Sequence, residues 1–272
     1  MSVIINTNTI IKTKTIVNSL PPISNSLIFY VDAADQTSYP ISSSKWYDLS
    51  PTKNTSSFIS TISGEVIPPF DPQYGGGIQY RGYATSQNQY SAIGRVAELQ
   101  PENVTVNIWF KVSGNTFNGN PVNTIFRTRL GGYIIQQRSN QTIEAIITNS
   151  SSSIPIDSGT PNLTSNVFSS PFNFNQVYNY TFSLGNNKFK TYINGTLVSE
   201  QPTFANFVLY NKDILNGDLF GDSYTAIGCD GDNIDRFFQG TVYNLQLYNR
   251  ALKDAEVLNL FNSFNTLRGF NV

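Results

Sequence analysis

The 272-residue sequence contains no histidine and only one cysteine, Cys229. Without histidine, catalysis by a Ser-His-Asp or Cys-His arrangement is excluded, as is every histidine-ligated metal site. A single cysteine allows no disulfide within the chain, so burial of apolar side chains has to stabilise the fold. Cys229 lies beside an apolar segment, and we expect it to be a small buried side chain.

Charge is also scarce. Charged residues make up 13% of the chain, and 17 basic against 18 acidic residues give a net charge of −1. An average soluble domain has roughly 25% charged residues. The sequence has no basic block and no interleaving of basic with aromatic residues, so no nucleic-acid partner is expected. No apolar run approaches the ~20 residues of a membrane span, and the first residues lack the apolar core of a secretion signal. We therefore expect neither a membrane span nor secretion.

Aromatic residues are abundant at 13%, and the segment 178–198 shows how they are used. It reads as two strands, 178–184 and 188–193, with a turn at 185–187. Asn194-Gly195 then leads into a third strand. Asn-Gly between β-prone runs is the strongest short-range hairpin signal, because both turn residues must accept positive φ. This turn places Ile193 opposite Thr196 and Tyr192 opposite Leu197.

The same alternation of strand and turn signals continues along the chain. A proline-rich stretch at 67–74 is unsuited to an inner strand, the alternation of the last strand breaks near Asn244, and 150–171 and 206–235 read as irregular loops. One helix is predicted at 253–264 from its apolar spacing and its acidic first turn. Many short strands with turns between them predict an all-β protein, an antiparallel β-sandwich jelly roll with one short C-terminal helix. Further strands are predicted at 26–32, 78–80, 90–93, 103–112, 123–129, 133–138, 141–148 and 238–248.

Residues 1–24 form a separate unit, an N-terminal extended arm that precedes a domain at 25–272. Apolar and polar residues alternate from 3 to 17, as in a strand with one apolar face, and Pro21-Pro22 ends the pattern as a stiff linker. One interpretation is a first strand of the main sheet or a frayed tail. The other is an assembly arm that adds to the sheet edge of another chain. Its apolar contacts would then be Val3, Ile5, Ile11 and Val17.

Acidic residues cluster near the C-terminal third of the chain. Asp230, Asp232 and Asp235 offer three carboxylates at loop-like spacing, which suits a hard cation such as calcium. The glutamate that completes an EF-hand loop is missing. The alternative is a solvated acidic loop with Asx turns. Calcium is the only cofactor that the residues suggest.

Loop aromatics provide a second candidate site. Trp46 and Tyr47 lie in a loop after the first strand, where they could stack on a sugar. The alternative is that these side chains belong to the sandwich core or to subunit contacts.

Four motifs, in this order along the chain, resemble a known family. The sequence resembles the laminin-G-like, or concanavalin A-like, lectin jelly roll, in the version common in bacteriophage and other viral structural proteins. The resemblance extends over residues 26–265. The first motif is 27–32 followed by Lys45-Trp46-Tyr47-Asp48-Leu49-Ser50. The second is 104–110, and the third is 191–198. The fourth consists of 226–228, 238–240 and 248–252, and it leads to Glu256.

One position departs from the family pattern. The family usually has serine or threonine where this chain has Lys253, three residues before Glu256. A serine or threonine there would cap the helix, whereas the lysine side chain cannot accept the N–H bonds of the first turn. We therefore expect a frayed helix start.

The resemblance implies a function without catalysis. Glycoside hydrolases of this superfamily carry a Glu-x-Asp-x-x-Glu strand, because a retaining enzyme needs two carboxylates about 5–5.5 Å apart. The glutamates of this chain are scattered, so no enzyme is expected. The resemblance implies a virion structural protein, a capsid-decoration, head-fibre or tail-associated adhesion module, assembled in the host cytoplasm. Its arm would attach it to other virion proteins or to itself as a homo-oligomer, and it would bind host surface glycans. The alternative is a free calcium-dependent carbohydrate-binding lectin.

Overall fold

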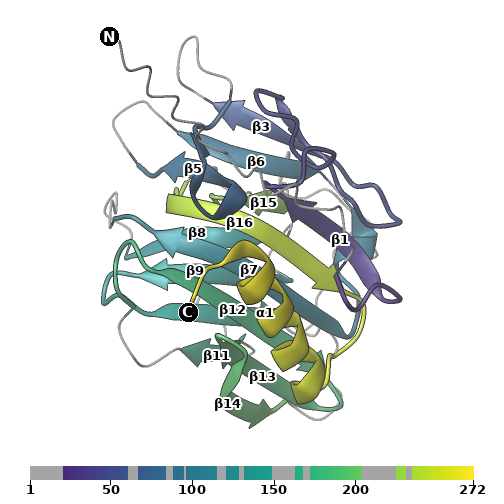
Figure 1. Ribbon diagram of the computed structural model, residues 1–272. Coiled ribbons are helices and arrows are strands. Elements are labelled where there is room, and N and C mark those ends of the chain that lie inside the picture. The colour runs from purple at the N-terminus through teal and green to yellow at the C-terminus, as the bar shows by residue number, and fades with distance from the viewer. Residues whose placement is uncertain are drawn as a thin grey trace, which may run out of the picture.

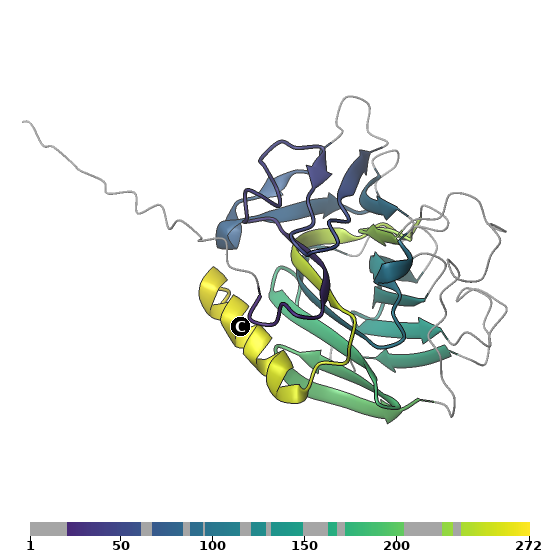
Figure 2. The ribbon, with the colours of Figure 1, turned by 90° about the vertical axis from the view of Figure 1, so that its right-hand side faces the viewer.

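In the described part of the chain, two antiparallel sheets of eight strands each form a sandwich, and one α-helix lies on its outside (Figures 1 and 2). This confirms the predicted fold class. The computed structural model describes residues 21–60, 67–83, 88–94, 96–114, 121–128, 132–148, 163–167, 172–203, 225–230 and 235–272. The four residues predicted for the assembly arm, Val3, Ile5, Ile11 and Val17, lie outside the described residues, so their role stays a prediction.

The first sheet carries the helix on its outer face. Most of its strands are hydrogen-bonded in one continuous order, and β1 (Leu27–Asp32) pairs with β16 (Gln239–Tyr248) outside that order. The order is β14 (Thr196–Pro202), β13 (Lys188–Ile193), β12 (Val177–Gly185), β7 (Val104–Val112), β16, β5 (Gly77–Arg81) and β4 (Phe70–Asp71).

The second sheet closes the other side of the core. Along the chain, two short 3-10 helices connect strands: η1 (Gln73–Gly75) lies between β4 and β5, and η2 (Ala97–Leu99) lies between β6 and β7. The strand order is β11 (Leu163–Val167), β10 (Ile143–Thr148), β9 (Tyr133–Arg138), β8 (Val122–Arg127), β15 (Thr225–Ile227), β6 (Gln89–Gly94), β3 (Ser56–Ser60) and β2 (Lys45–Trp46).

Strand alternation determines which side chains form the core. In β7, Val106, Ile108 and Phe110 belong to the cluster between the two sheets, whereas Trp109 points to the helix side. β16 carries a bulge between Val242 and Asn244, which is where the sequence alternation breaks. A bulge adds one residue to a strand and so shifts the following side chains to the other face.

The β12–β13–β14 meander has the predicted register. Tyr192 pairs with Leu197 and Ile193 with Thr196. Both of its turns use two residues with positive φ: Asn186-Asn187 at 53° and 57°, and Asn194-Gly195 at 49° and 73°. This is the left-handed geometry that suits the twist of two-residue hairpins.

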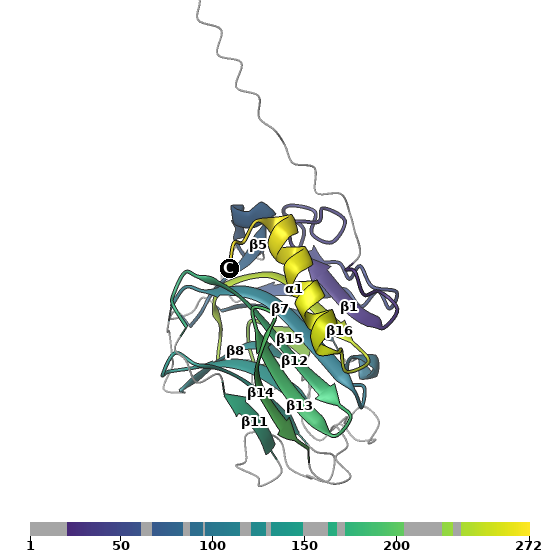
Figure 3. The same cartoon turned by 60° about the horizontal axis from the view of Figure 1, so that its bottom comes forward.

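Helix α1 (Asp254–Arg268) lies on the outer face of the first sheet (Figures 2 and 3). Its apolar side chains pack against that face. The Phe261 ring stacks on Trp109 with centroids 5.4 Å apart. The helix continues four residues beyond the predicted end at 264 and stops at Gly269, whose φ of 67° gives a left-handed C-cap. Near that end, Arg268 lies 2.6 Å from the buried carboxylate of Asp32 and so joins α1 to β1.

Two strands lie in segments that were wrongly predicted as irregular chain, and a third lies where no element was predicted. β11 and β15 fall within 150–171 and 206–235, and β3 is the unpredicted strand. β3 and β11 are mostly polar, and β15 has only three residues, so none of them shows a recognisable apolar alternation. They form because each has a neighbouring strand to pair with, which the local sequence does not reveal.

The outer edge of β1 is occupied by a loop. The backbone N–H of Tyr30 donates to the Asp48 side chain at 2.9 Å, and the Asp32 N–H donates to Ser38 Oγ at 3.0 Å. Thr52 Oγ1 donates to the Ile28 carbonyl oxygen at 2.5 Å. Asp48 also accepts bonds from Ser50 and Asn54. The aspartate of the Lys45–Ser50 motif therefore organises the loop and closes the strand edge.

Candidate functional site

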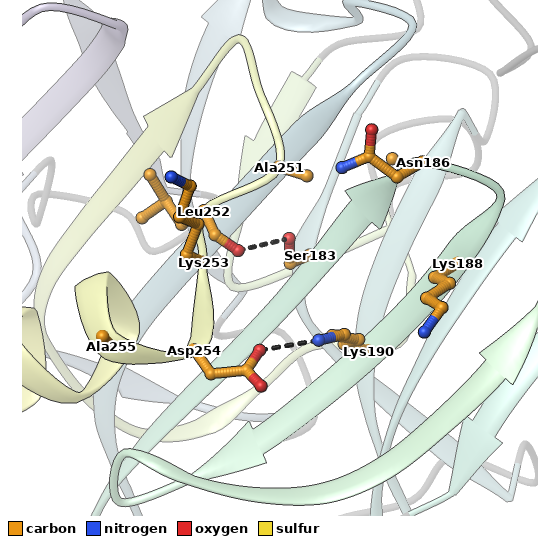
Figure 4. A pocket seen from close by; sticks show the side chains of 10 residues that line it. Ser183, Asn186, Lys188, Lys190, Ala251, Leu252, Lys253, Asp254 and Ala255 are labelled. Carbon is orange, nitrogen blue, oxygen red and sulfur yellow. Dashed lines mark hydrogen bonds and ion pairs between the residues drawn. The ribbon is translucent and has the colours of Figure 1, made fainter.

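A hollow of about 530 Å³ lies where the β12–β13 hairpin meets the start of α1 (Figure 4). The strands contribute Ser183, Lys188 and Lys190, and the segment that enters the helix contributes Lys253 and Asp254. The hollow thus joins parts of the chain that are far apart in sequence. Because the hairpin turn needs only Asn186 and Asn187, both sides of the hollow rest on regular structure.

The segment before α1 is fixed to the sheet by a small hydroxyl network. Thr105 Oγ1 accepts a bond from the Leu252 N–H at 2.9 Å and donates to the Arg250 carbonyl oxygen at 2.9 Å. Ser183 Oγ, at the floor of the hollow, donates to the Leu252 carbonyl oxygen at 3.4 Å. The position of Lys253 and Asp254 relative to the strands is therefore defined by backbone contacts.

A ladder of ion pairs crosses the hollow. Glu200 on β14 lies 2.5 Å from Lys188 and 3.3 Å from Lys190, and Lys190 lies 2.7 Å from Asp254. Tyr192 donates to the same Asp254 carboxylate at 2.8 Å. The hydrogen bond with Asp254 raises the pKa of Lys190, and the same bond lowers the pKa of Asp254. Both groups are therefore charged at neutral pH.

Lys253 is the cation of this group that forms no ion pair among the described residues, although its charge still acts on the Glu256 carboxylate. Its backbone N–H donates to Glu256 Oε2 at 2.8 Å, and its side chain makes no capping bond. Within the described residues no ion pair involves its ammonium group, which is exposed. Three lysines against Glu200 and Asp254 leave one net positive charge at the hollow.

The hollow is lined by hydrogen-bond donors as well as by the apolar side chains of Ala251, Leu252 and Ala255. No aromatic side chain is among the described residues that line it, which instead offer ammonium groups, the Asn186 amide and one carboxylate. Such groups bind hydroxyl and anionic groups through hydrogen bonds, which are strongest when one partner is charged. The residues suit recognition of a polar ligand.

The two aromatic residues predicted to bind sugars lie apart from this hollow and differ from each other. Trp46 is 0% exposed and stacks on Phe58 in the core, with ring centroids 6.3 Å apart, so its ring offers no surface to a ligand. For Trp46 the core alternative holds. Tyr47 is 38% exposed, and its role stays a prediction.

Two of the three predicted calcium ligands, Asp230 and Asp235, belong to an ion-pair cluster with arginines. The buried Asp230 carboxylate lies 2.5 Å from Arg127 and 3.1 Å from Arg236. The Asp230 N–H donates to the carbonyl oxygen of Asp235, whereas Asp232 lies outside the described residues. In the described part of the chain no three acidic or cysteine side chains gather as a metal site. A calcium ion would have to compete with two arginines for Asp230, and the site stays a prediction.

The sequence contains one signal for the hollow, the lysine at position 253. Because Lys253 departs from the helix-capping pattern, it predicts a frayed helix start and gives no indication of a ligand contact. Lys188 and Lys190 gave no signal, because alternate lysines on an exposed hairpin are common.

A sandwich of two antiparallel sheets with one C-terminal helix on its outside is the architecture of a lectin-like jelly roll. The family model of the concanavalin A-like lectin/glucanases superfamily matches residues 85–258. Because this match covers more than half of the chain, the protein belongs to that superfamily. No curated protein sequence matches the chain. Of the described helices, none has the length and apolar character needed to cross a bilayer.

Several solved structures share the fold. The binding domain of botulinum neurotoxin DC in complex with rat synaptotagmin II has a TM-score of 0.59 and 14% identity, over 89% of this chain and 52% of that one. A structure of botulinum neurotoxin type C, whose cell entry depends on two ganglioside molecules, has a TM-score of 0.59 and 15% identity over the same shares. A Trypanosoma rangeli sialidase mutant has a TM-score of 0.57 and 12% identity, over 90% and 34%.

This chain spans about half the length of the neurotoxin structures that it matches. At these identities the likeness shows the fold alone.

Proposed function

We propose that the protein is a non-enzymatic, saccharide-binding structural module of a virion, and that the hollow between the β12–β13 hairpin and α1 is its binding site. The observation that carries this proposal is the hollow itself: a polar, open site on rigid elements in a member of a lectin superfamily. Sites on strands and helices hold their donors in fixed positions, which lowers the entropic cost of binding.

The surroundings of the glutamates support a role without catalysis. Glu144 is buried and lies 2.7 Å from Arg138, Glu200 pairs with two lysines, and Glu256 pairs with Arg250 at 2.7 Å. A hydrolase of this superfamily needs two carboxylates that both face the scissile bond. Carboxylates already neutralised by a cation are poorly placed to donate or accept a proton.

The proposed virion role rests on the four sequence motifs and on the arm. Neighbours with the same fold include a neurotoxin that depends on gangliosides for cell entry, which fits a fold able to present a glycan site. For this protein, attachment to other virion proteins or to itself would come from the apolar face of residues 3–17. Location in the virion follows from that attachment.

Static light scattering tests the arm. The variant Ile5→Asp/Ile11→Asp puts two charges on the apolar face of the full-length chain, and Asn6→Asp/Asn8→Asp puts them on the opposite face as a control. We expect the unmodified chain and the control to be the same defined oligomer, and the first variant to be a monomer. If all three are monomers, the arm is no self-assembly device, and the free-lectin alternative leads.

A glycan array with the full-length protein tests the site, with and without EDTA. We expect binding that EDTA leaves unchanged, because lysine and amide donors need no metal. Loss of binding with EDTA would favour the calcium-dependent lectin and the Asp230 cluster. The absence of any binding would overturn the saccharide role.

A further inference from the structure

The distribution of charge around the hollow bears on whether an acidic or a neutral saccharide would bind there. Figure 4 shows Asn186 and Lys188 on one side of the hollow and Asp254 on the other, with Lys190 between them and bonded to Asp254. Lys188 and Lys190 share Glu200, and Lys190 also meets Asp254, so those charges are compensated. Lys253, next to Asp254 in the chain, lines the helix side of the hollow and forms no ion pair among the described residues; its charge acts on the Glu256 carboxylate, which Arg250 already holds.

The end of the helix is not the source of this charge. Asp254 and Glu256 already occupy the first turn of α1, where they compensate the positive end of the helix dipole. Glu256 is in turn held by Arg250 through two bonds of 2.7 and 2.8 Å. The net positive charge at the hollow therefore comes from a side chain, which a substitution can remove.

The lining also disfavours a neutral sugar. Neutral sugars gain much of their affinity by burying an apolar ring face on an aromatic side chain, and the described lining residues include no aromatic ring. A ligand bound here must gain its affinity from hydrogen bonds, and bonds to a charged group are roughly twice as strong as neutral ones. A carboxylate or sulfate on the ligand would supply such bonds.

We propose that the hollow binds an acidic saccharide, with Lys253 contacting its carboxylate or sulfate and with the Lys190–Asp254 pair and Asn186 contacting its hydroxyl groups. This inference rests on the proposed saccharide-binding function and names the ligand class for the same site. The contact is partly exposed, so added salt weakens it by screening.

Titration calorimetry on the full-length protein with 3′-sialyllactose and lactose tests the proposal, because the two sugars differ by one acidic residue. We expect measurable binding of the acidic sugar and binding of lactose at least about 10-fold weaker, a difference of about 1.4 kcal/mol. Raising the salt from 50 to 500 mM should reduce the affinity for sialyllactose only.

Three variants assign the effect to the hollow. Lys253→Gln should weaken sialyllactose binding about 5- to 20-fold, whereas Lys53→Gln, a change at an exposed lysine on another loop, should leave it unchanged. Glu200→Gln removes the carboxylate that neutralises Lys188 and Lys190, and it should tighten binding several-fold. A gain in affinity cannot arise from misfolding.

The outcomes separate the two proposals. Equal affinity for both sugars, or preference for lactose, overturns the acidic-saccharide inference and leaves the saccharide-binding function in place. Binding of sialyllactose that neither Lys253→Gln nor Glu200→Gln alters overturns the assignment to this hollow. If neither sugar binds at millimolar concentration, the acidic-saccharide inference is wrong, and the glycan array decides whether the saccharide-binding function is wrong as well.

Discussion

The ammonium group of Lys190 lies 2.7 Å from the carboxylate of Asp254, a residue 64 positions further along the chain. This contact ties β13 to the first turn of α1 and forms one wall of the hollow. Because Asp254 is largely exposed, the pair is worth about 0.2–1 kcal/mol of stability. A double-mutant cycle with Lys190→Met and Asp254→Asn, followed by urea unfolding, should give a coupling energy in that range. A coupling of zero would show that the pair adds nothing to the stability of the fold.

Glu256 should make the stability depend on pH in the acid range. The Arg250 guanidinium lowers the pKa of Glu256 from 4.5 to about 2 in the folded protein. A carboxyl whose pKa is lowered by folding adds stability above its unfolded pKa, and this contribution is lost as the pH falls from about 4.5 to 2. Glu256→Gln should cost about 1 kcal/mol at pH 7, after allowance for partial exposure.

Urea unfolding of both proteins at pH 7 and pH 2.5 checks this expectation. The difference in unfolding free energy between Glu256→Gln and the unmodified protein should shrink at the lower pH. A difference that does not change with pH would mean that the Arg250 contact is not ionic.

The buried pair of Arg268 and Asp32 should be among the most sensitive contacts of the protein. Arg268 also donates to the carbonyl oxygen of Tyr74 at 3.0 Å, and Tyr30 donates to Asp32 at 3.0 Å. Removing one partner of a buried pair leaves the other charge uncompensated, which costs about 3–5 kcal/mol. We expect that loss from Arg268→Met in urea unfolding, and a smaller loss from the double variant with Asp32→Leu. An equal or greater loss in the double variant would contradict this explanation.

The Asn194-Gly195 turn gives a test with a matched control. Gly195 has φ of 73°, and a Cβ atom there would lie 2.9 Å from the Phe261 side chain; Gly94 has φ of 87° with nothing within 4 Å. Alanine at either position strains the backbone by about 1–3 kcal/mol. Only Gly195→Ala should add the cost of displacing Phe261 from Trp109. Its melting temperature should therefore fall further than that of Gly94→Ala, and an equal fall would exclude the contact.

Replacing Lys253 by serine should raise the free energy of unfolding and weaken the binding of an acidic saccharide. Serine at the N-cap can accept the first-turn N–H bonds that lysine leaves unmade, and such caps contribute about 1 kcal/mol. We expect Lys253→Ser to unfold at higher urea concentration and to bind sialyllactose more weakly. Greater stability together with unchanged binding would mean that Lys253 neither caps the helix nor contacts the saccharide.

Local signals were sufficient for most of the fold. Positive-φ turn residues and strand alternation predicted the β12–β14 meander down to the pairing of Tyr192 with Leu197, and the broken alternation near Asn244 marked the bulge. β11 and β15 were missed because short polar strands depend on their neighbours for pairing. The last turn of α1 was missed because its contacts with distant strands are invisible in a local pattern.

The candidate site could not be predicted from the sequence, because its residues come from segments that are far apart in the chain. Lys188 and Lys253 come together only when α1 docks on the first sheet. Trp46 and Tyr47 are neighbours in sequence, yet Trp46, at the end of β2, is buried, and Tyr47, just beyond that strand, is exposed. Composition predicts that aromatic residues are present in a loop but not which of them meets solvent.

The Asp48 loop that closes β1 has a consequence for crowded conditions. Proteins mounted on a particle stand at high local concentration, where an open strand edge can fuse with the edge of a neighbour and start irreversible clumping. Here the outward backbone groups of Ile28, Tyr30 and Asp32 are already bonded to Thr52, Asp48 and Ser38. This edge is therefore closed to strand addition by a neighbouring copy, however densely the domains are packed.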